Sequence, residues 1–231
     1  MEHVKILQTM LDMQQRLNNQ TCGIGWENGY TKDGKVISWK RCIYMECAEL
    51  INSFSWKHWK NISQSADMQN ARVEMVDIWH FIMSLMLEYY TTNSIGDNEV
   101  LSEHISSVSG FSKFCNEPFS GGTNSHYEIV NDIESLIHKC SGFNYKLEDV
   151  LTNYFRIALS CGVNLNILFK LYIGKNVLNR FRQEHGYKEG NYKKYWNGKE
   201  DNEIMSIILD NGTIEEDKIY NALENEYKKA K

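Results

Sequence analysis

Apolar residues recur every three or four positions along much of this chain. Near the amino terminus they include Val4, Leu7, Met10 and Leu17. This spacing places apolar side chains along one face of an α-helix. The same pattern predicts further helices over residues 40–54, 73–83, 129–137, 147–161, 164–184 and 200–209.

Turn-forming residues separate these segments. Glycine, asparagine and aspartate cluster over 23–34, 91–97 and 118–125, and a glycine-flanked basic loop is predicted over 186–198. The 231 residues include a single proline, Pro118. Because proline breaks helices and is common in the turns of β-rich proteins, we expect an all-α fold, a compact helical bundle. We expect one domain over 1–231, with two helical subdomains divided at 118–125 as the alternative.

Composition narrows the class of protein. Hydrophobic residues make up 42% of the chain and aromatic residues 12%, which is typical of a folded globular protein. The net charge of −5 argues against a broad nucleic-acid-binding surface. Without a signal-peptide pattern or a run of about 18 apolar residues, we expect a cytoplasmic protein with no membrane span. The six cysteines form no Cys-x-x-Cys pair, so we expect reduced thiols.

Two acidic pairs stand out within the predicted helices. Glu46 and Glu49 are three residues apart with apolar flanks, and Glu74 and Asp77 repeat this arrangement. Residues three apart on a helix lie within about 60° of each other, so each pair projects two carboxylates to one side. Four converging carboxylates make an oxygen site that prefers Mg²⁺ or Mn²⁺. The alternative is that these acids are ordinary solvated helix residues.

A basic segment lies toward the carboxyl terminus. Residues 170–199 carry eight basic and two acidic side chains in a chain of net charge −5. Lys175, Asn179 and Arg182 are spaced to share one helix face, and Lys194 follows in the glycine-flanked loop. Such a face suits a phosphate-bearing small ligand better than a duplex, with a solvated basic face as the alternative. Together with the acidic pairs, it indicates metal-dependent chemistry on a nucleoside polyphosphate.

Polar side chains also fall on apolar faces. Gln14 and Asn18 lie on the apolar stripe of the first helix, where buried amides need hydrogen-bonding partners. A pyrimidine edge is one candidate partner, and neighbouring backbone is the other. Trp56, Trp59 and His80 are candidates for the walls of a base pocket, with plain core positions as the alternative.

Five stretches of the chain resemble a known family. They are MQQRLN at 13–18, YMECAEL at 44–50, SWKHWKN at 55–61, RVEMVDIWHF at 72–81 and YIGKNVLNRFRQEHGYK at 172–188. In this order they resemble the dimeric, all-α dUTPases of the MazG-like nucleotide pyrophosphatase superfamily, close to the Campylobacter-type form. The resemblance covers most of the chain, and it implies a homodimer with a rigid helical part and a mobile part.

The resemblance gives each candidate residue a role. It implies that Mg²⁺, with Mn²⁺ as a possible substitute, is bound by Glu46, Glu49, Glu74 and Asp77. It implies that the substrate phosphates are held by Lys175, Arg182, Tyr187 and Lys194. It further implies that the uracil and deoxyribose are read by Gln14, Asn18, His80 and Asn179, with Trp56 near the base. Which of Trp56, His58 and Trp59 meets the nucleotide stays open.

The implied reaction is hydrolysis of dUTP to dUMP and pyrophosphate, and of dUDP to dUMP and phosphate. In this reaction Mg²⁺ neutralises phosphate charge and lowers the pKa of a bound water, while Glu46 or Glu49 accepts the proton. Such a dUTP diphosphatase limits uracil incorporation into DNA and supplies dUMP. The expected partner is the small-molecule substrate, with no nucleic acid and no membrane.

Three alternatives accompany this interpretation. A sister pyrophosphatase acting on dCTP or on a broader set of nucleoside triphosphates would differ only in the base pocket. A di-iron carboxylate bundle fits Asp77 and His80 as half of a site, but the second Glu-x-x-His half is missing. A helical interaction module, whose basic segment binds nucleic acid or protein, would leave the buried amides and the acidic pairs without a purpose.

Overall fold

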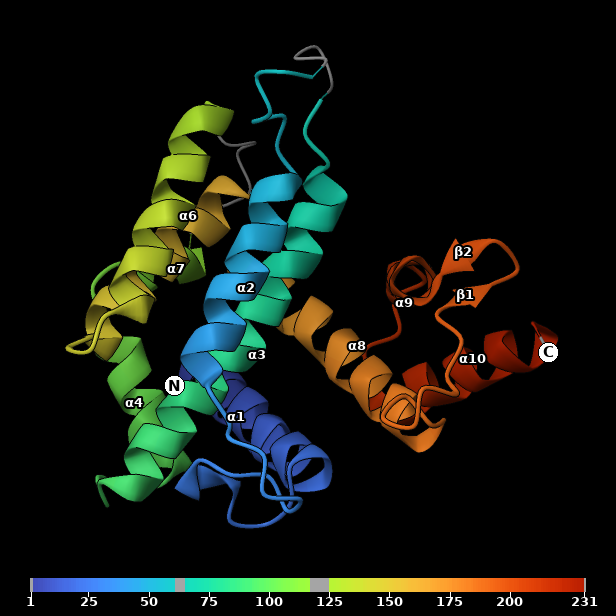
Figure 1. Ribbon diagram of the computed structural model, residues 1–231, viewed down its shortest axis with the longest axis horizontal. Helices are drawn as coiled ribbons and strands as arrows, with labels where there is room; N and C mark the ends of the chain where they lie inside the picture. The colour runs from blue at the N-terminus through green and yellow to red at the C-terminus, as the bar shows by residue number, and fades with distance from the viewer. Residues whose placement is uncertain (1, 61–64, 117–124, 231) are drawn as a thin grey trace. The chain divides into compact units, whose positions relative to one another are not determined.

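A computed structural model describes residues 2–60, 65–116 and 125–230 (Figure 1). These residues form ten α-helices, a short 3₁₀ turn (Trp26–Asn28) and one antiparallel pair of two-residue strands. The expectation of an all-α fold is confirmed. Most of the predicted loop at 118–125 lies outside the described residues.

The chain divides into two compact units, Met1–Ile167 and Leu168–Lys231. The division falls in the first turn of helix α8 (Leu165–Glu184), and not at 118–125. A single functional domain over 1–231 stays a prediction. The helices of the first unit are α1 (Glu2–Thr21), α2 (Trp39–Asn52), α3 (Met68–Thr92), α4 (Asn98–Ser107), α5 (Phe111–Asn116), α6 (His126–Ser141) and α7 (Leu147–Ser160).

Helix α3 forms the centre of the first unit. Its residues 82–87 are all buried, so this stretch is covered on every side, as expected for a helix inside a core. Helix α2 packs along α3, and α6 packs against α2, as their neighbouring ribbons show (Figure 1). Helix α1 packs against both α3 and α4. The two helices that carry the acidic pairs are therefore direct neighbours.

Local sequence fixes where these two helices begin. The side chain of Ser38 accepts a hydrogen bond from the backbone N–H of Arg41 at the start of α2, and Asp67 caps α3 through the N–H of Asn70. Such caps satisfy backbone donors that the first turn of a helix leaves without partners. The caps thus set the register of the helices that position Glu46 and Asp77.

The second unit is held together by aromatic side chains. It contains most of α8, the strands β1 (Tyr195–Trp196) and β2 (Lys199–Glu200), and helices α9 (Asp201–Asp210) and α10 (Glu216–Lys229). The ring centroid of Phe181 lies 5.7 Å from that of Trp196 and 5.5 Å from that of Tyr227. Gly174 permits the close approach of α9, because a Cβ there would lie 2.7 Å from Leu209.

All seven predicted helices are found, and the described residues form three more. Helices α4, α5 and α10 lie in stretches where no helix was predicted. In α10 only three residues are buried, at spacings of four, and charged residues surround them, so the apolar signal is thin. The predicted basic loop at 186–198 contains β1 as well as turns.

Among the described residues, no single helix is long and apolar enough to cross a membrane. Helices α7 and α8, which are joined at a bend, are long and apolar enough only when they are taken together.

Candidate metal and nucleotide site

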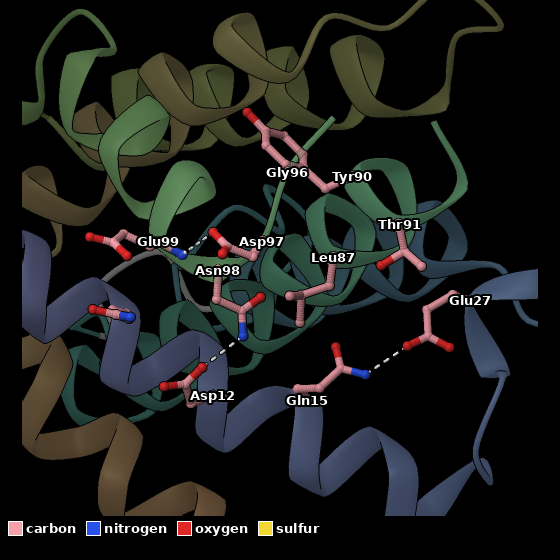
Figure 2. A pocket seen from close by; sticks show the side chains of 11 residues that line it. Asp12, Gln15, Glu27, Leu87, Tyr90, Thr91, Gly96, Asp97, Asn98 and Glu99 are labelled. Atoms are coloured by element: carbon pink, nitrogen blue, oxygen red, sulfur yellow. Dashed lines mark hydrogen bonds between the residues drawn. The ribbon is translucent and has the colours of Figure 1, made fainter. Parts of the chain in front are cut away.

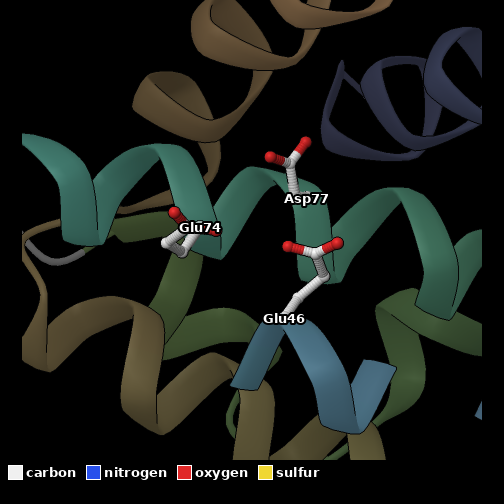
Figure 3. A group of neighbouring side chains, drawn as sticks. All are labelled: Glu46, Glu74 and Asp77. Carbon is white, nitrogen blue, oxygen red and sulfur yellow. The ribbon is translucent and has the colours of Figure 1, made fainter. Parts of the chain in front are cut away.

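Three of the four predicted carboxylates converge between α2 and α3. Glu46 on α2 and Glu74 and Asp77 on α3 each offer a carboxylate oxygen within 4.8 Å of the others. Figure 3 shows Glu46 directed from α2 toward the stretch of α3 that carries the other two. Glu74 is buried, and Glu46 and Asp77 are partly buried. We call these three residues the carboxylate cluster.

The fourth predicted acid, Glu49, lies next to the carboxylate cluster without belonging to it. Its side chain is exposed. Its charge nevertheless acts on Glu46, one turn earlier on α2. Glu49 therefore occupies a position from which it adds negative potential at the cluster.

Burial and crowding of negative charge set the protonation of Glu46. Burial raises the pKa of Glu46 to about 8, and the charges of Asp77, Glu49 and Glu74 add to this effect. A proton on Glu46 relieves the repulsion, and a divalent cation would relieve it as well. Closely spaced oxygen donors of this kind are the ligands that Mg²⁺ and Mn²⁺ prefer. The donor set therefore fits the metal that the sequence predicts.

The predicted base-reading amides form a buried network in the same unit. Gln14 and Asn18 on α1 are each 3% exposed, which confirms that they lie on the buried stripe of that helix. Nε2 of Gln14 donates to Oδ1 of Asn18 at 2.8 Å. Oε1 of Gln14 lies 2.6 Å from Nδ1 of His80 on α3. Because a carboxamide oxygen can only accept, His80 carries its proton on Nδ1.

Ser84 completes this network. Its hydroxyl oxygen accepts from Nε2 of Gln14 at 3.2 Å and from Nδ2 of Asn18 at 3.0 Å. These hydrogen bonds of Gln14 and Asn18 run to other side chains, which the sequence prediction did not anticipate. We call Gln14, Asn18, His80 and Ser84 the amide network.

The carboxylate cluster and the amide network share one side of α3. Asp77, His80 and Ser84 follow one another at intervals of three and four residues. On a helix that rises 1.5 Å per residue, this places Asp77 and Ser84 about 10 Å apart along the axis. One helix thus carries residues of the carboxylate cluster and then residues of the amide network along its length.

Trp56 lies in the loop after α2. Its side chain is 43% exposed, its ring meets that of Trp59 edge to face with centroids 5.4 Å apart, and its Nε1 donates to Oδ1 of Asn52 at 3.3 Å. Trp56 also lines a pocket of about 260 Å³ together with Phe54 and Lys57. No hydrogen bond or ring contact found among the described residues joins Trp56 to the amide network.

The second unit gathers the five predicted residues of the basic segment. Nζ of Lys175 donates to Oδ1 of Asn202 at 2.9 Å, and Nη2 of Arg182 reaches the same oxygen at 3.4 Å. Nη1 of Arg182 donates to Oδ1 of Asn179 at 3.3 Å. The ring of Tyr187 faces both Arg182 and Lys194, whose charged groups lie 5.8 and 5.7 Å from its centroid.

Two of these basic residues, Lys175 and Arg182, do not lie on a solvated face. Lys175 is 4% exposed and Arg182 is 8% exposed, whereas Lys194 is exposed and Tyr187 is 40% exposed. The Arg182 guanidinium forms a salt bridge with the fully buried carboxylate of Asp201. The alternative of a solvated basic face therefore fails for Lys175 and Arg182, because side chains of α9 cover them.

A separate polar pocket of about 410 Å³ lies in the first unit (Figure 2). Asp12, Glu27, Asp97 and Glu99 are among its lining residues, and none of the predicted site residues is. Figure 2 shows two hydrogen bonds between lining residues, from Asn98 to Asp12 and from Gln15 to Glu27. With four carboxylates and no basic side chain in its lining, this pocket is unsuited to a phosphate group.

Residues 6–187 match the family described as dUTPase. The chain belongs to the dUTPase family. A search of curated protein sequences finds no match. Family membership makes this protein an enzyme that hydrolyses dUTP, a dUTP diphosphatase.

The family match covers the stretches of α1, α2 and α3 that carry the carboxylate cluster and the amide network. It ends at Tyr187, so Lys194, Asp201 and Asn202 lie beyond it. The enzyme therefore combines a family segment with a carboxyl-terminal segment whose side chains contact Arg182 and Lys175.

Ser84, Asp201 and Asn202 hydrogen-bond to predicted site residues of this dUTPase but were not themselves predicted from the sequence. Ser84 was missed although it follows His80 by four residues, a spacing that places both on one helix face. Asp201 and Asn202 gave no signal of their own, because two acidic or amide residues at the start of a helix are ordinary. Only the folded second unit brings them to Arg182 and Lys175.

Proposed function

We propose that this dUTPase cleaves dUTP to dUMP and pyrophosphate, and dUDP to dUMP and phosphate, in a reaction that requires Mg²⁺. Mn²⁺ is the proposed substitute. The observation that carries the proposal is the convergence of Glu46, Glu74 and Asp77 within 4.8 Å, in a chain of the dUTPase family. The reaction limits uracil incorporation into DNA and supplies dUMP.

The proposed metal ligands are the carboxylate cluster and Glu49. When bound, a divalent cation supplies neutralisation of phosphate charge and a more acidic water. Glu46 and Glu49 are the two candidates for accepting a proton from the attacking water. The position of Glu46 within the carboxylate cluster supports its assignment as a proton acceptor.

The proposed phosphate ligands are Lys175, Arg182, Tyr187 and Lys194. Their mutual contacts within the second unit support a common role. Charged and phenolic donors of this kind stabilise negative charge that develops on the leaving phosphate. Asn202 and Asp201 hold Lys175 and Arg182 in fixed orientations for that purpose.

The proposed nucleoside ligands are Gln14, Asn18, His80 and Asn179, with Trp56 near the base. The order of Asp77, His80 and Ser84 along α3 supports this assignment, because a nucleotide also presents its phosphates and its base in sequence. Unpaired polar groups at a pyrimidine edge disfavour cytosine, and lack of room for a methyl group disfavours thymine.

We further propose that the enzyme is a homodimer in the cytoplasm. The resemblance to dimeric all-α dUTPases supports the dimer, and six free cysteines suit a reducing compartment. Sedimentation velocity should give twice the chain mass of 27.0 kDa. A species of 27.0 kDa at micromolar concentration contradicts the dimer.

The test of the proposed function is a substrate panel. Release of pyrophosphate and of phosphate is measured with dUTP, dUDP, UTP, dCTP and dTTP, with Mg²⁺ and with EDTA. We expect turnover of dUTP and dUDP that stops in EDTA. Turnover that persists in EDTA contradicts the metal assignment, and equal turnover of dCTP favours the broader pyrophosphatase.

A further inference from the structure

Ser84 is the centre of the amide network. It lies in the middle of α3 and is fully buried. Its hydroxyl accepts hydrogen bonds from Nε2 of Gln14 and from Nδ2 of Asn18. It donates its proton to the backbone oxygen of His80 at 2.9 Å, in preference to the more distant Oδ1 of Asn18 at 3.4 Å. A hydroxyl has one proton and two lone pairs, so these three bonds use it fully.

This arrangement fixes which way the two carboxamides face. With the Ser84 proton committed to the backbone, the hydroxyl presents only lone pairs to α1. The NH₂ groups of Gln14 and Asn18 must therefore face Ser84. A flipped Asn18 would place its oxygen against a lone pair of Ser84 and its NH₂ against the NH₂ of Gln14. Both contacts are repulsive, so only one orientation is stable.

The orientation of a carboxamide decides which pyrimidine it complements. Uracil presents a carbonyl oxygen at position 4 and an N–H at position 3, whereas cytosine presents an amino group and a bare ring nitrogen. An amide that presents a donor to one of these edges presents a mismatch to the other. Among the hydrogen bonds of the described residues, Asn18 uses only one of its two N–H groups, so the second is available to a ligand oxygen.

We propose that Ser84 is a positioning residue that sets the preference of this enzyme for uracil over cytosine. It acts through Gln14 and Asn18, whose NH₂ groups it holds toward α3. This inference rests on the proposed role of these two amides in reading the base.

The test compares two serine variants. Ser84→Ala removes the hydroxyl that holds the amides. Ser102→Ala is the matched control, because Ser102 is equally buried on a helix of the same unit and donates only to the backbone oxygen of Glu99. For each variant and the wild type, kcat/KM is measured with dUTP and with dCTP. Thermal unfolding of each protein checks the fold.

We expect the ratio of kcat/KM for dUTP to that for dCTP to fall about tenfold in Ser84→Ala, the equivalent of about one hydrogen bond. Ser102→Ala should keep the wild-type ratio. An unchanged ratio in Ser84→Ala, or an equal loss with both substrates, overturns the proposal, because a purely structural role lowers both activities together.

If Ser84→Ala does not fold, Ser84→Cys replaces it, since a thiol fills similar space but hydrogen-bonds weakly, and the same fall in ratio is expected. If the wild type hydrolyses no dUTP, the proposed function itself fails and this inference falls with it. Wild-type activity with an unchanged variant ratio overturns the role of Ser84 alone.

Discussion

Nη2 of Arg182 lies 2.7 Å from Oδ1 of Asp201, and Nε of the same side chain lies 2.9 Å from Oδ2. This bidentate contact joins α8 to the first residue of α9. The hydroxyl of Tyr192 also donates to Oδ2 of Asp201 at 2.8 Å. These bonds fix the orientation of the guanidinium, with Nη1 directed at Asn179.

Removing the charge of Asp201 should destabilise the protein. Asp201→Asn takes the carboxylate away from a nearly buried guanidinium, which costs about 3 kcal/mol in the free energy of unfolding. The control is Asp210→Asn, since Asp210 forms an exposed ion pair with Lys170 at 3.5 Å and should cost less than about 0.5 kcal/mol. Urea unfolding followed by circular dichroism measures both. Equal stabilities of the two variants would show that the buried pair contributes nothing.

Lys194 should affect substrate binding without affecting the fold. Its side chain is exposed, and its ammonium lies over the ring of Tyr187. Lys194→Ala should raise KM for dUTP about tenfold, because one charge-assisted contact to phosphate is lost. Lys193→Ala, at the exposed neighbouring position, is the control and should change KM little. Steady-state kinetics measure KM for both variants and the wild type. Identical KM values for Lys194→Ala and the wild type would show that Lys194 does not bind phosphate.

Glu88 should make the stability of the first unit depend on pH. Burial raises the pKa of Glu88 above its ordinary value of 4.5, and the charge of Glu27 adds to the rise while Lys40 opposes it. The folded chain therefore holds this proton more tightly than the unfolded chain. Stability from this group is present below pH 4.5 and is lost as the pH rises through the folded pKa.

Glu88→Gln should therefore raise the free energy of unfolding at pH 7.5, by less than about 1 kcal/mol because the carboxyl is half-exposed. The gain should vanish at pH 4. Glu103→Gln, an exposed position on α4, is the control and should give no gain. Denaturant unfolding at both pH values provides the measurement, and a gain of equal size at pH 4 would rule out the electrostatic cause.

Local spacing explains what the sequence predicts well. Glu74 and Asp77 fall on one side of α3 because three residues make almost one helical turn, and the same rule places Gln14 and Asn18 on the buried face of α1. These relationships depend only on the helix itself. They can therefore be predicted from the sequence before any tertiary contact is known.

Contacts that depend on tertiary folding cannot be predicted from local spacing. Asp201 meets Arg182 only because the chain turns back through β1 and β2, across 19 residues. Ser84 sits in an apolar stretch where a serine usually bonds to its own helix, and its role appears only when α1 packs beside α3. The weakly apolar α10 was missed because its burial comes from the aromatic cluster of the second unit.

Pyrophosphate release from dUTP as a function of Mg²⁺ concentration tests the carboxylate cluster as the metal site most directly. Wild type and Glu134→Gln, an exposed control on α6, should show turnover that saturates with Mg²⁺ and stops in EDTA. Glu74→Gln, Asp77→Asn and Glu49→Gln should lose at least about 100-fold in turnover, since each removes an oxygen ligand, while keeping the helical circular dichroism signal. Variants of Glu74 and Asp77 that retain wild-type turnover and Mg²⁺ dependence would contradict the carboxylate cluster as the metal site.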